Sequence, residues 1–87
     1  MSTDEIRAAV KQSVASIANL DVREIGDDAS YKEDLQLDSL SILEISVDCE
    51  MQWEINLTED DLAGISTVAD TVRIIEQYLS APSVAAA

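Results

Sequence analysis

The stretch Leu35-Gln36-Leu37-Asp38-Ser39-Leu40 places a serine at the point where a helix is predicted to begin. Asp38 is a favourable residue just before a helix, because its carboxylate accepts hydrogen bonds from the free backbone N–H groups of the first turn. Ser39 is then the first helical residue, and its hydroxyl lies at the positive end of the helix dipole, where a phosphate ester would be stabilised. A role in the cap alone explains these few residues at least as well.

The composition leaves few ways to build an active site. The 87 residues form one domain with a modest core, and they include no histidine, a single cysteine (Cys49) and no metal-ligand spacing. We therefore expect neither a catalytic nor a metal site, and we interpret Cys49 as a small core residue. The start has no signal-peptide pattern, and no apolar run approaches the roughly 20 residues that span a bilayer. These features predict a cytoplasmic protein.

The charge is strongly one-sided. The chain has 18 acidic and 5 basic residues, a formal net charge of −13. From Glu33 to Val72 there is no lysine or arginine, so Ser39 lies in an acidic field. Nucleic acids and anionic membranes are therefore poor partners, whereas a protein with a basic patch would be attracted. An acidic surface that serves only solubility explains the same pattern.

Apolar residues recur at helical spacing in three long segments. The first predicted helix runs from about Thr3 to Ala18, after a capping box formed by Ser2 and Glu5. Its core positions are predicted to be Ile6, Val10, Val14 and Ile17. The second predicted helix runs from Ser39 to about Trp53. Its side chains expected to face the core are Leu43, Val47, Cys49 and Trp53.

A short helix and a last long helix are predicted in the C-terminal half. Thr58 should cap a short helix that continues through Leu62 and ends at Gly64. Ser66 or Thr67 should cap the last helix. The core stripe of this last helix is predicted to be Val68, Val72, Ile75 and Leu79, with Tyr78 beside it.

The segment before Ser39 is too irregular for a further helix. We expect Tyr31 and Leu35 to pin this long loop across the helices, because a structureless loop of this length is uncommon in a compact domain. The fold prediction is an all-α, small four-helix bundle with three main helices, one short helix and a long first loop. It assigns residues 1–80 to one domain and 81–87 to a flexible C-terminal tail.

The second helix carries more apolar side chains than one buried stripe requires. Some of them are therefore expected to stay exposed or half-exposed and to form a partner-recognition surface with nearby acidic residues. The residues assigned to this surface are Leu40, Ile42, Glu44, Ile45, Asp48 and Met51. Packing of Ile42 and Met51 beneath the neighbouring loop is the alternative.

Several short motifs follow one another without a gap. Asp38-Ser39-Leu40 is preceded by Ser30-Tyr31-Lys32-Glu33-Asp34-Leu35 and followed by Ile65-Ser66-Thr67-Val68. With these motifs the chain resembles the acyl carrier proteins over nearly its whole length. The family has an Asp-Ser-Leu signature, a Ser-Phe-x-x-Asp-Leu lead-in and an Ile-Thr-Thr-Val opening of the last helix. Gln36 departs from the family pattern, because it stands where a glycine is usual.

The resemblance implies that Ser39 carries covalent 4′-phosphopantetheine, with Asp38 and Leu40 as its flanking motif. A phosphopantetheinyl transferase would attach this arm from coenzyme A, and acyl groups would be held as thioesters on its thiol. The protein would be a monomeric carrier rather than an enzyme, working in polyketide or fatty-acid biosynthesis. Its partners would be ketosynthase, acyltransferase or acyl-ligase type enzymes with basic docking patches.

The signature also bears on the kind of carrier. Leu37-Asp38-Ser39-Leu40 is more similar to polyketide-type carriers than to peptidyl carriers, which usually have a glycine pair before the serine. We therefore expect a discrete carrier of a specialised polyketide or fatty-acid pathway. A peptidyl or aminoacyl carrier with the same arm, and an acidic interaction module that carries nothing, are the alternatives.

Overall fold

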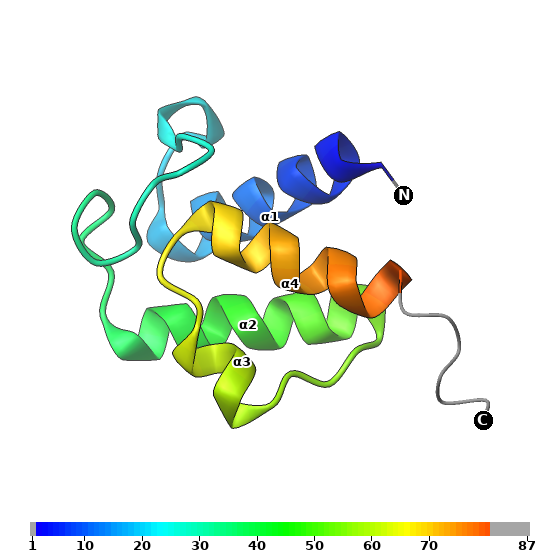
Figure 1. Cartoon of the computed structure of the whole chain (residues 1–87). Coiled ribbons are helices and arrows are strands. Elements are labelled where there is room, and N and C mark those ends of the chain that lie inside the picture. Colours follow the sequence, from blue (N-terminus) through cyan, green and yellow to red (C-terminus); the bar gives the residue numbers. More distant parts are fainter. Residues whose placement is uncertain (1, 81–87) are drawn as a thin grey trace, which may run out of the picture.

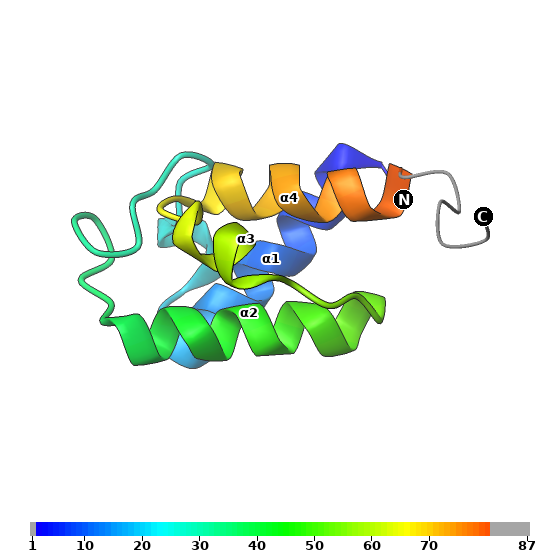
Figure 2. The same ribbon diagram turned by 60° about the horizontal axis from the view of Figure 1, so that its bottom comes forward.

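The computed structural model describes residues 2–80, which form a bundle of α-helices joined by loops (Figure 1). The elements are α1 (Thr3–Ala18), the short 3-10 turn η1 (Val22–Glu24), α2 (Ser39–Trp53), α3 (Glu59–Ala63) and α4 (Val68–Ser80). Helix α1 runs opposite to α2 and α4, and α3 lies beside α2 (Figures 1 and 2). The predicted all-α four-helix bundle is confirmed, although the long loop also contains η1. The predicted tail, residues 81–87, lies outside the described residues.

Side-chain caps fix the starts of the first two main helices. The Ser2 hydroxyl accepts a hydrogen bond from the backbone N–H of Glu5 (3.2 Å), and the Glu5 carboxylate accepts from the N–H of Ser2 (3.0 Å). The predicted capping box is therefore present. The Asp38 carboxylate accepts from the N–H of Ser41 (2.8 Å), so that α2 begins at Ser39 as predicted.

The two C-terminal helices begin in the same way. Thr58 and Asp61 form a reciprocal pair at the start of α3, with N···O distances of 3.1 and 3.0 Å. Thr67 and Asp70 form an equivalent pair at α4, with both distances 3.1 Å. The cap of α4 is therefore Thr67, which resolves the choice between Ser66 and Thr67.

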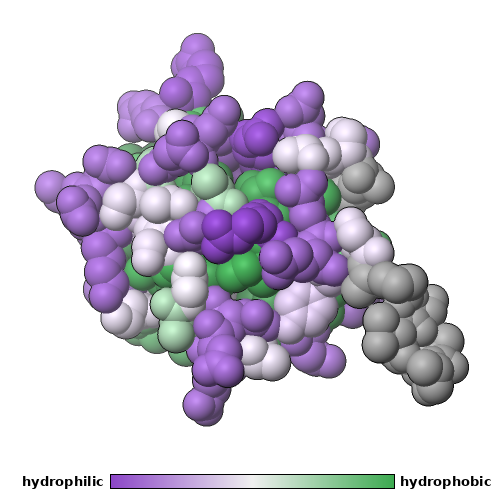
Figure 3. Space-filling view, in the orientation of Figure 1, coloured by the Kyte–Doolittle hydropathy of each residue, from purple (hydrophilic) through white to green (hydrophobic). Residues whose placement is uncertain are grey.

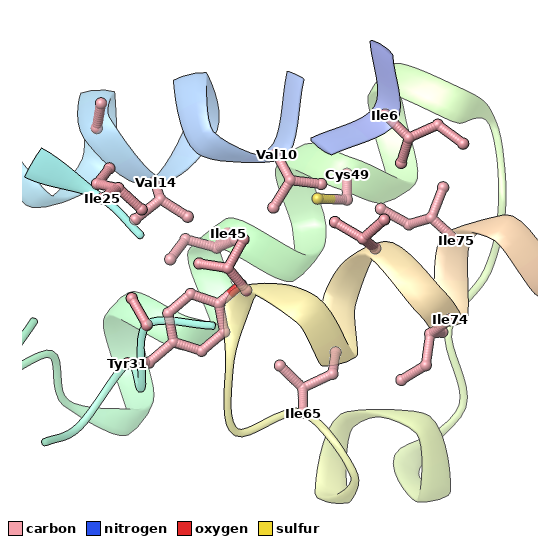
Figure 4. Packing of buried hydrophobic residues seen from close by; sticks show 14 residues of the cluster. Ile6, Val10, Val14, Ile25, Tyr31, Ile45, Cys49, Ile65, Ile74 and Ile75 are labelled. Atoms are coloured by element: carbon pink, nitrogen blue, oxygen red, sulfur yellow. The ribbon is translucent and has the colours of Figure 1, made fainter. Parts of the chain in front are cut away.

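The core lies between α1, α2 and α4 (Figure 4). Its residues are less than a tenth exposed and include Ile6, Val10 and Val14 of α1, Ile45 and Cys49 of α2, and Val68, Val72 and Ile75 of α4. The predicted α1 stripe is thus confirmed, except that Ile17 is only half-buried. None of the helices in residues 2–80 is long and apolar enough to cross a membrane.

The predicted core face of α2 is wrong in part. Leu43 and Val47 are 46% and 44% exposed, whereas Ile45, expected on the outside, is 1% exposed. Apolar residues surround this helix, so several adjacent stripes fit helical spacing equally well. The stripe through Ile45 and Cys49 is the one that packs against α1 and α4. Trp53 is half-buried against this core.

The predicted core stripe of α4 extends one turn beyond the last buried residue of the helix. Leu79 is 41% exposed, because it lies in the last turn of α4, beyond the last buried residue of the helix, Ile75. Ile74, which the spacing did not select, is buried beside Ile75. Tyr78 is half-buried against the core.

The long loop is pinned by Tyr31, as predicted. Its ring is fully buried, and its hydroxyl shares a hydrogen bond of 2.6 Å with Thr71 of α4. Burial raises the pKa of Tyr31. Backbone bonds of 3.0 Å, from Tyr31 N to Ser66 O and from Val68 N to Ala29 O, join the loop to the segment before α4. Leu35, the other predicted pin, is half-buried against the core.

Candidate functional site

Ser39 is the exposed first residue of α2. The carboxylate of its neighbour Asp38 forms the helix cap, and hydrogen bonds from the backbone N–H and then from the side chain of Ser41 lower the pKa of Asp38 below the usual 3.8. Among residues 2–80, no side chain forms a hydrogen bond with the Ser39 hydroxyl. The site therefore presents a free hydroxyl beside backbone N–H groups and lacks a base that would make Ser39 a nucleophile.

The segment leading to Ser39 is held in a fixed path. The Leu37 N–H donates to the Tyr31 carbonyl (2.7 Å), and the Leu37 side chain packs against the core. Between these residues Gln36 has φ of 55°, in the left-handed region that favours glycine. A non-glycine residue there costs roughly 1–2 kcal/mol. This conformation explains physically why a glycine is usual at this position in the family that the sequence resembles.

A hollow of about 560 Å³ opens beside Ser39. One wall is a face of α2, on which Ser39, Ile42, Leu43 and Ser46 succeed one another at helical spacing. The loop and the α3 region supply the remaining lining residues, which are Ser30, Lys32, Glu33, Leu62, Ala63, Ile65 and Ser66. The lining mixes apolar and hydroxyl side chains, so it suits a flexible chain that has both polar and apolar parts.

Two carboxylates hold the α3 wall of this hollow. The Glu50 carboxylate on α2 accepts from the N–H of Leu57 (2.8 Å), in the segment that leads to α3. The Asp61 carboxylate accepts from the N–H of Thr58 (3.0 Å) and from the hydroxyl of Tyr78 on α4. The position of the short helix thus depends on these two carboxylate acceptors.

The attachment of α3 should weaken in acid. The backbone hydrogen bond from Thr58, followed by that from the Tyr78 hydroxyl, lowers the pKa of Asp61 below the usual 3.8. A carboxylate whose pKa is lowered by folding contributes stability above its unfolded pKa and loses it as the pH falls through the folded value. Asp61→Asn should therefore lower the thermal midpoint at pH 7, and this difference from the wild type should shrink below pH 3.8.

Asp60 provides the matched control for this pH experiment. It is exposed on the same helix, and its carboxylate has no hydrogen-bond partner among the described residues. Asp60→Asn should leave the thermal midpoint nearly unchanged across the same pH range. If Asp61→Asn and Asp60→Asn followed the same pH profile, general charge repulsion rather than the α3 attachment would explain the effect.

The outer face of α2 carries an exposed apolar ridge, which consists of Leu40, Leu43, Val47 and Met51. Leu40 and Met51 are 64% and 76% exposed, and apolar areas show between hydrophilic side chains over α2 (Figure 3). The ridge differs from the predicted recognition surface. Ile45 does not belong to it because it is buried, and Ile42 is half-buried against the core.

The two predicted acidic residues of this face differ in their surroundings. Glu44 is exposed and has no hydrogen-bond or ion-pair partner among residues 2–80. Asp48 accepts a hydrogen bond from the hydroxyl of Ser13 on α1 and therefore lies toward the α1 side of the helix. The carboxylate of Glu44 is therefore more available than that of Asp48 for contact with a partner protein.

Comparison with known proteins identifies the family. Residues 8–75 match the family model described as a phosphopantetheine attachment site. The chain is 36% identical over 74 residues to an acyl carrier protein of Rhodococcus erythropolis, covering 85% of this chain and 81% of that protein. The chain belongs to the acyl carrier protein family. The acyl carrier role in fatty-acid or polyketide-type biosynthesis and the phosphopantetheine cofactor are thereby confirmed.

Other acyl carrier proteins are similar at comparable levels. The chain is 32% identical over 77 residues to the meromycolate extension acyl carrier protein of Mycobacterium leprae, covering 88% of this chain and 67% of that protein. In structure it is similar to the acyl carrier protein of Enterococcus faecalis, with a TM-score of 0.70 and 24% identity over 86% of this chain and 95% of that one. This last likeness concerns the fold alone.

Cys49 lies apart from the carrier chemistry. It is fully buried in the core, and burial, followed by the charges of Asp48 and Glu50, raises the pKa of its thiol to about 12. A thiol with such a pKa is hardly ionised at pH 7 and is a poor nucleophile. The prediction that Cys49 is a small core residue is confirmed.

The sequence did not identify several residues of this carrier's site. Leu43 and Val47 were assigned to the core but lie on the exposed ridge. Glu50 and Asp61 were not distinguished from the other residues of the acidic field, although they hold the α3 wall. The capping pattern of Thr58 and Asp61 was the only signal available for this role, because the contact with Tyr78 joins residues 17 positions apart.

Proposed function

We propose that Ser39 is the residue to which 4′-phosphopantetheine is attached. The observation that carries this proposal is the exposed Ser39 at the capped start of α2, inside the matched region and in the lining of the hollow. A phosphodiester at this point meets the free N–H groups and the positive dipole end of a 15-residue helix. The flanking residues Asp38 and Leu40 complete the motif that a transferase would recognise.

The experiment is an in vitro attachment reaction. Incubation with coenzyme A, Mg²⁺ and a broad-specificity phosphopantetheinyl transferase should add one arm, about 340 Da, to the intact protein. Fragmentation of the modified protein should place that mass on Ser39. Attachment at another serine, or no gain in mass, would overturn the proposal.

We further propose that the arm and its cargo rest in the hollow between α2 and α3 when no partner is bound. The support is the mixed lining, in which Ser30, Ser46 and Ser66 offer hydroxyls and Ile42, Leu43 and Leu62 offer apolar surface. A flexible arm anchored at the rim would let the protein deliver cargo into other active sites without a catalytic site of its own.

The proposed partners are biosynthetic enzymes that present a basic patch around an apolar groove. Transferases, ketosynthases, acyltransferases and acyl ligases with such patches fit this description. The apolar ridge of α2 would fill the groove, while the surrounding acidic residues, Glu44 among them, would steer the encounter. Because the ridge extends to Met51, three turns beyond Leu40, we propose a dedicated set of partners in a specialised pathway.

Reversal of one charge should slow docking. Glu44→Lys should reduce the association rate with a partner enzyme about tenfold at low salt, and the effect should fade as ionic strength rises. Glu24→Lys is the matched control, because Glu24 is exposed on η1 and brings the same change in charge. Surface plasmon resonance at several salt concentrations measures both rates. Equal slowing by both variants would favour net charge over a docking face.

A further inference from the structure

The five basic residues of this acidic protein differ in whether they form an ion pair. Four of the five form an ion pair with an aspartate: Arg7 with Asp4, Lys11 with Asp27, Arg23 with Asp21 and Arg73 with Asp70. Lys32 forms no ion pair or side-chain hydrogen bond with any residue in the described range 2–80. With 18 acidic residues in the chain, an unpaired cation is the exception.

Lys32 lies at the hollow that begins at Ser39. Among the described residues it is the only cation in the lining, whose other charged member is Glu33. Glu33 follows directly in the chain and lines the same hollow, but it does not pair with Lys32. The nearby Asp34 carboxylate accepts from the backbone N–H of Ser30 (2.8 Å) and likewise forms no ion pair with Lys32. The ammonium group of Lys32 is therefore available to an anion at this place.

The backbone of Lys32 is held firmly although its side chain is free. The preceding residue, Tyr31, is fully buried and bonded to Thr71. The turn that contains Lys32 is closed by bonds of 3.0 Å from the N–H groups of Asp34 and Leu35 to the Ser30 carbonyl. A long side chain on such an anchored turn has a fixed origin and a restricted reach.

An arm on Ser39 would bring a permanent negative charge to this hollow. A phosphodiester is ionised at all physiological pH values, and here it would stand beside Asp38 and Glu33 in a chain with net charge −13. The surrounding carboxylates repel such an anion, and a nearby cation would offset this repulsion beyond what the start of α2 provides. Within residues 2–80, Lys32 is the one residue of the lining that can supply that cation, and it lines the same hollow as Ser39.

We propose that Lys32 binds the phosphodiester of the arm and holds the first part of the arm over the hollow. This proposal rests on the proposed attachment at Ser39. The interaction is exposed to solvent, so its effect on stability is small, but it orders the arm at its root. Loading an acyl group onto the distal thiol would leave this contact in place, because the phosphodiester is common to every loaded form.

The test compares the apo protein with the protein that carries the arm. Intact mass first establishes that the arm is attached, in the wild type and in Lys32→Gln and Lys32→Arg alike. Because the chain has only two lysines, Lys11 and Lys32, their side-chain CH₂ signals can be resolved by NMR, and Lys32→Arg assigns them. Attachment of the arm should shift the Lys32 signals and leave those of Lys11 unchanged.

A second readout measures the charge contact. For each variant, the thermal midpoint of the arm-bearing form is compared with that of the apo form at low ionic strength. This difference should be about 2–4 °C lower in Lys32→Gln than in the wild type, and Lys32→Arg should restore the wild-type difference. Arg73→Gln, which removes a charge on α4, should not change this difference. The ³¹P signal of the arm should shift in Lys32→Gln and remain near the wild-type position in Lys32→Arg.

The outcomes separate the two proposals. If no arm mass is gained, the attachment at Ser39 fails. If the arm is attached but neither the Lys32 signals nor the ³¹P signal respond, the role of Lys32 is overturned and the attachment stands. If the Lys32 signals move only after a carboxylate-bearing acyl group is loaded, Lys32 contacts cargo rather than the phosphodiester, and this proposal is likewise overturned.

Discussion

Ser39→Ala should abolish arm addition completely, whereas the wild type gains about 340 Da in the same reaction. The effect is all-or-none because the serine oxygen is itself the atom that bonds to phosphorus, and alanine offers no substitute. The alanine should leave α2 intact, since the helix cap is formed by Asp38 and the backbone N–H of Ser41, not by the Ser39 side chain. Intact-protein mass spectrometry measures the result.

Ser41 supplies the control for this experiment. It lies in the same turn, two residues further on, and the backbone N–H that it donates to the cap is kept in the alanine variant. Ser41→Ala should accept the arm as the wild type does, and circular dichroism should show the same helix content in both variants. A residual mass gain in Ser39→Ala would mean that another hydroxyl carries the arm.

In the proposed function, three parts of a small chain divide the work of a carrier. The start of α2 would offer the attachment point, the ridge from Leu40 to Met51 would offer apolar surface to a partner, and the hollow would offer a resting place. All three include residues of α2, so a partner that docks on the ridge would also meet the proposed attachment point. Docking and delivery would thereby be coupled.

Helix boundaries could be predicted well because local chemistry decides them. The caps at Ser2, Asp38 and Thr58 each bind backbone N–H groups only three residues away. Such short-range rules can be read from a sequence without knowledge of the fold. The same rules place Ser39 at the start of α2, whereas its role as the attachment serine comes from the family motif and stays a prediction.

The orientation of α2 could not be predicted in this way. Its apolar residues surround the helix, so the choice between the Ile45 stripe and the Leu43 stripe depends on where α1 and α4 lie. Helix α4 shows the contrast, because its apolar residues gather on one side and Val68, Val72 and Ile75 were placed correctly. The buried face of a helix can be predicted from its sequence only when polar residues occupy the opposite face.

The hollow is a feature of the assembled fold. It joins residues of the long loop, α2 and the α3 region, which are separated by up to 36 positions between Ser30 and Ser66. Lys32 shows the consequence: in the sequence it is one of five basic residues, and only the structure shows that the other four are paired.

The long loop should depend on one aromatic side chain. Tyr31→Ala should lower the free energy of unfolding by about 3–5 kcal/mol, because it removes a buried ring and leaves a cavity between the loop and α4. This is a large part of the about 5–15 kcal/mol that stabilises a typical domain. Urea unfolding followed by circular dichroism measures it, and Tyr31→Phe provides a variant that keeps the ring.

Tyr31→Phe separates packing from hydrogen bonding. It removes only the bond between the Tyr31 hydroxyl and Thr71, and the Thr71 hydroxyl keeps its bond to the Thr67 carbonyl (3.3 Å), so no buried polar group is left unpaired. The loss should therefore be only about 1 kcal/mol. If Tyr31→Phe destabilised as much as Tyr31→Ala, the hydroxyl rather than the ring would be the anchor. The side-chain anchoring of the turn that carries Lys32 would then rest on the hydroxyl bond to Thr71, beside the backbone bonds to Ser66 and Val68.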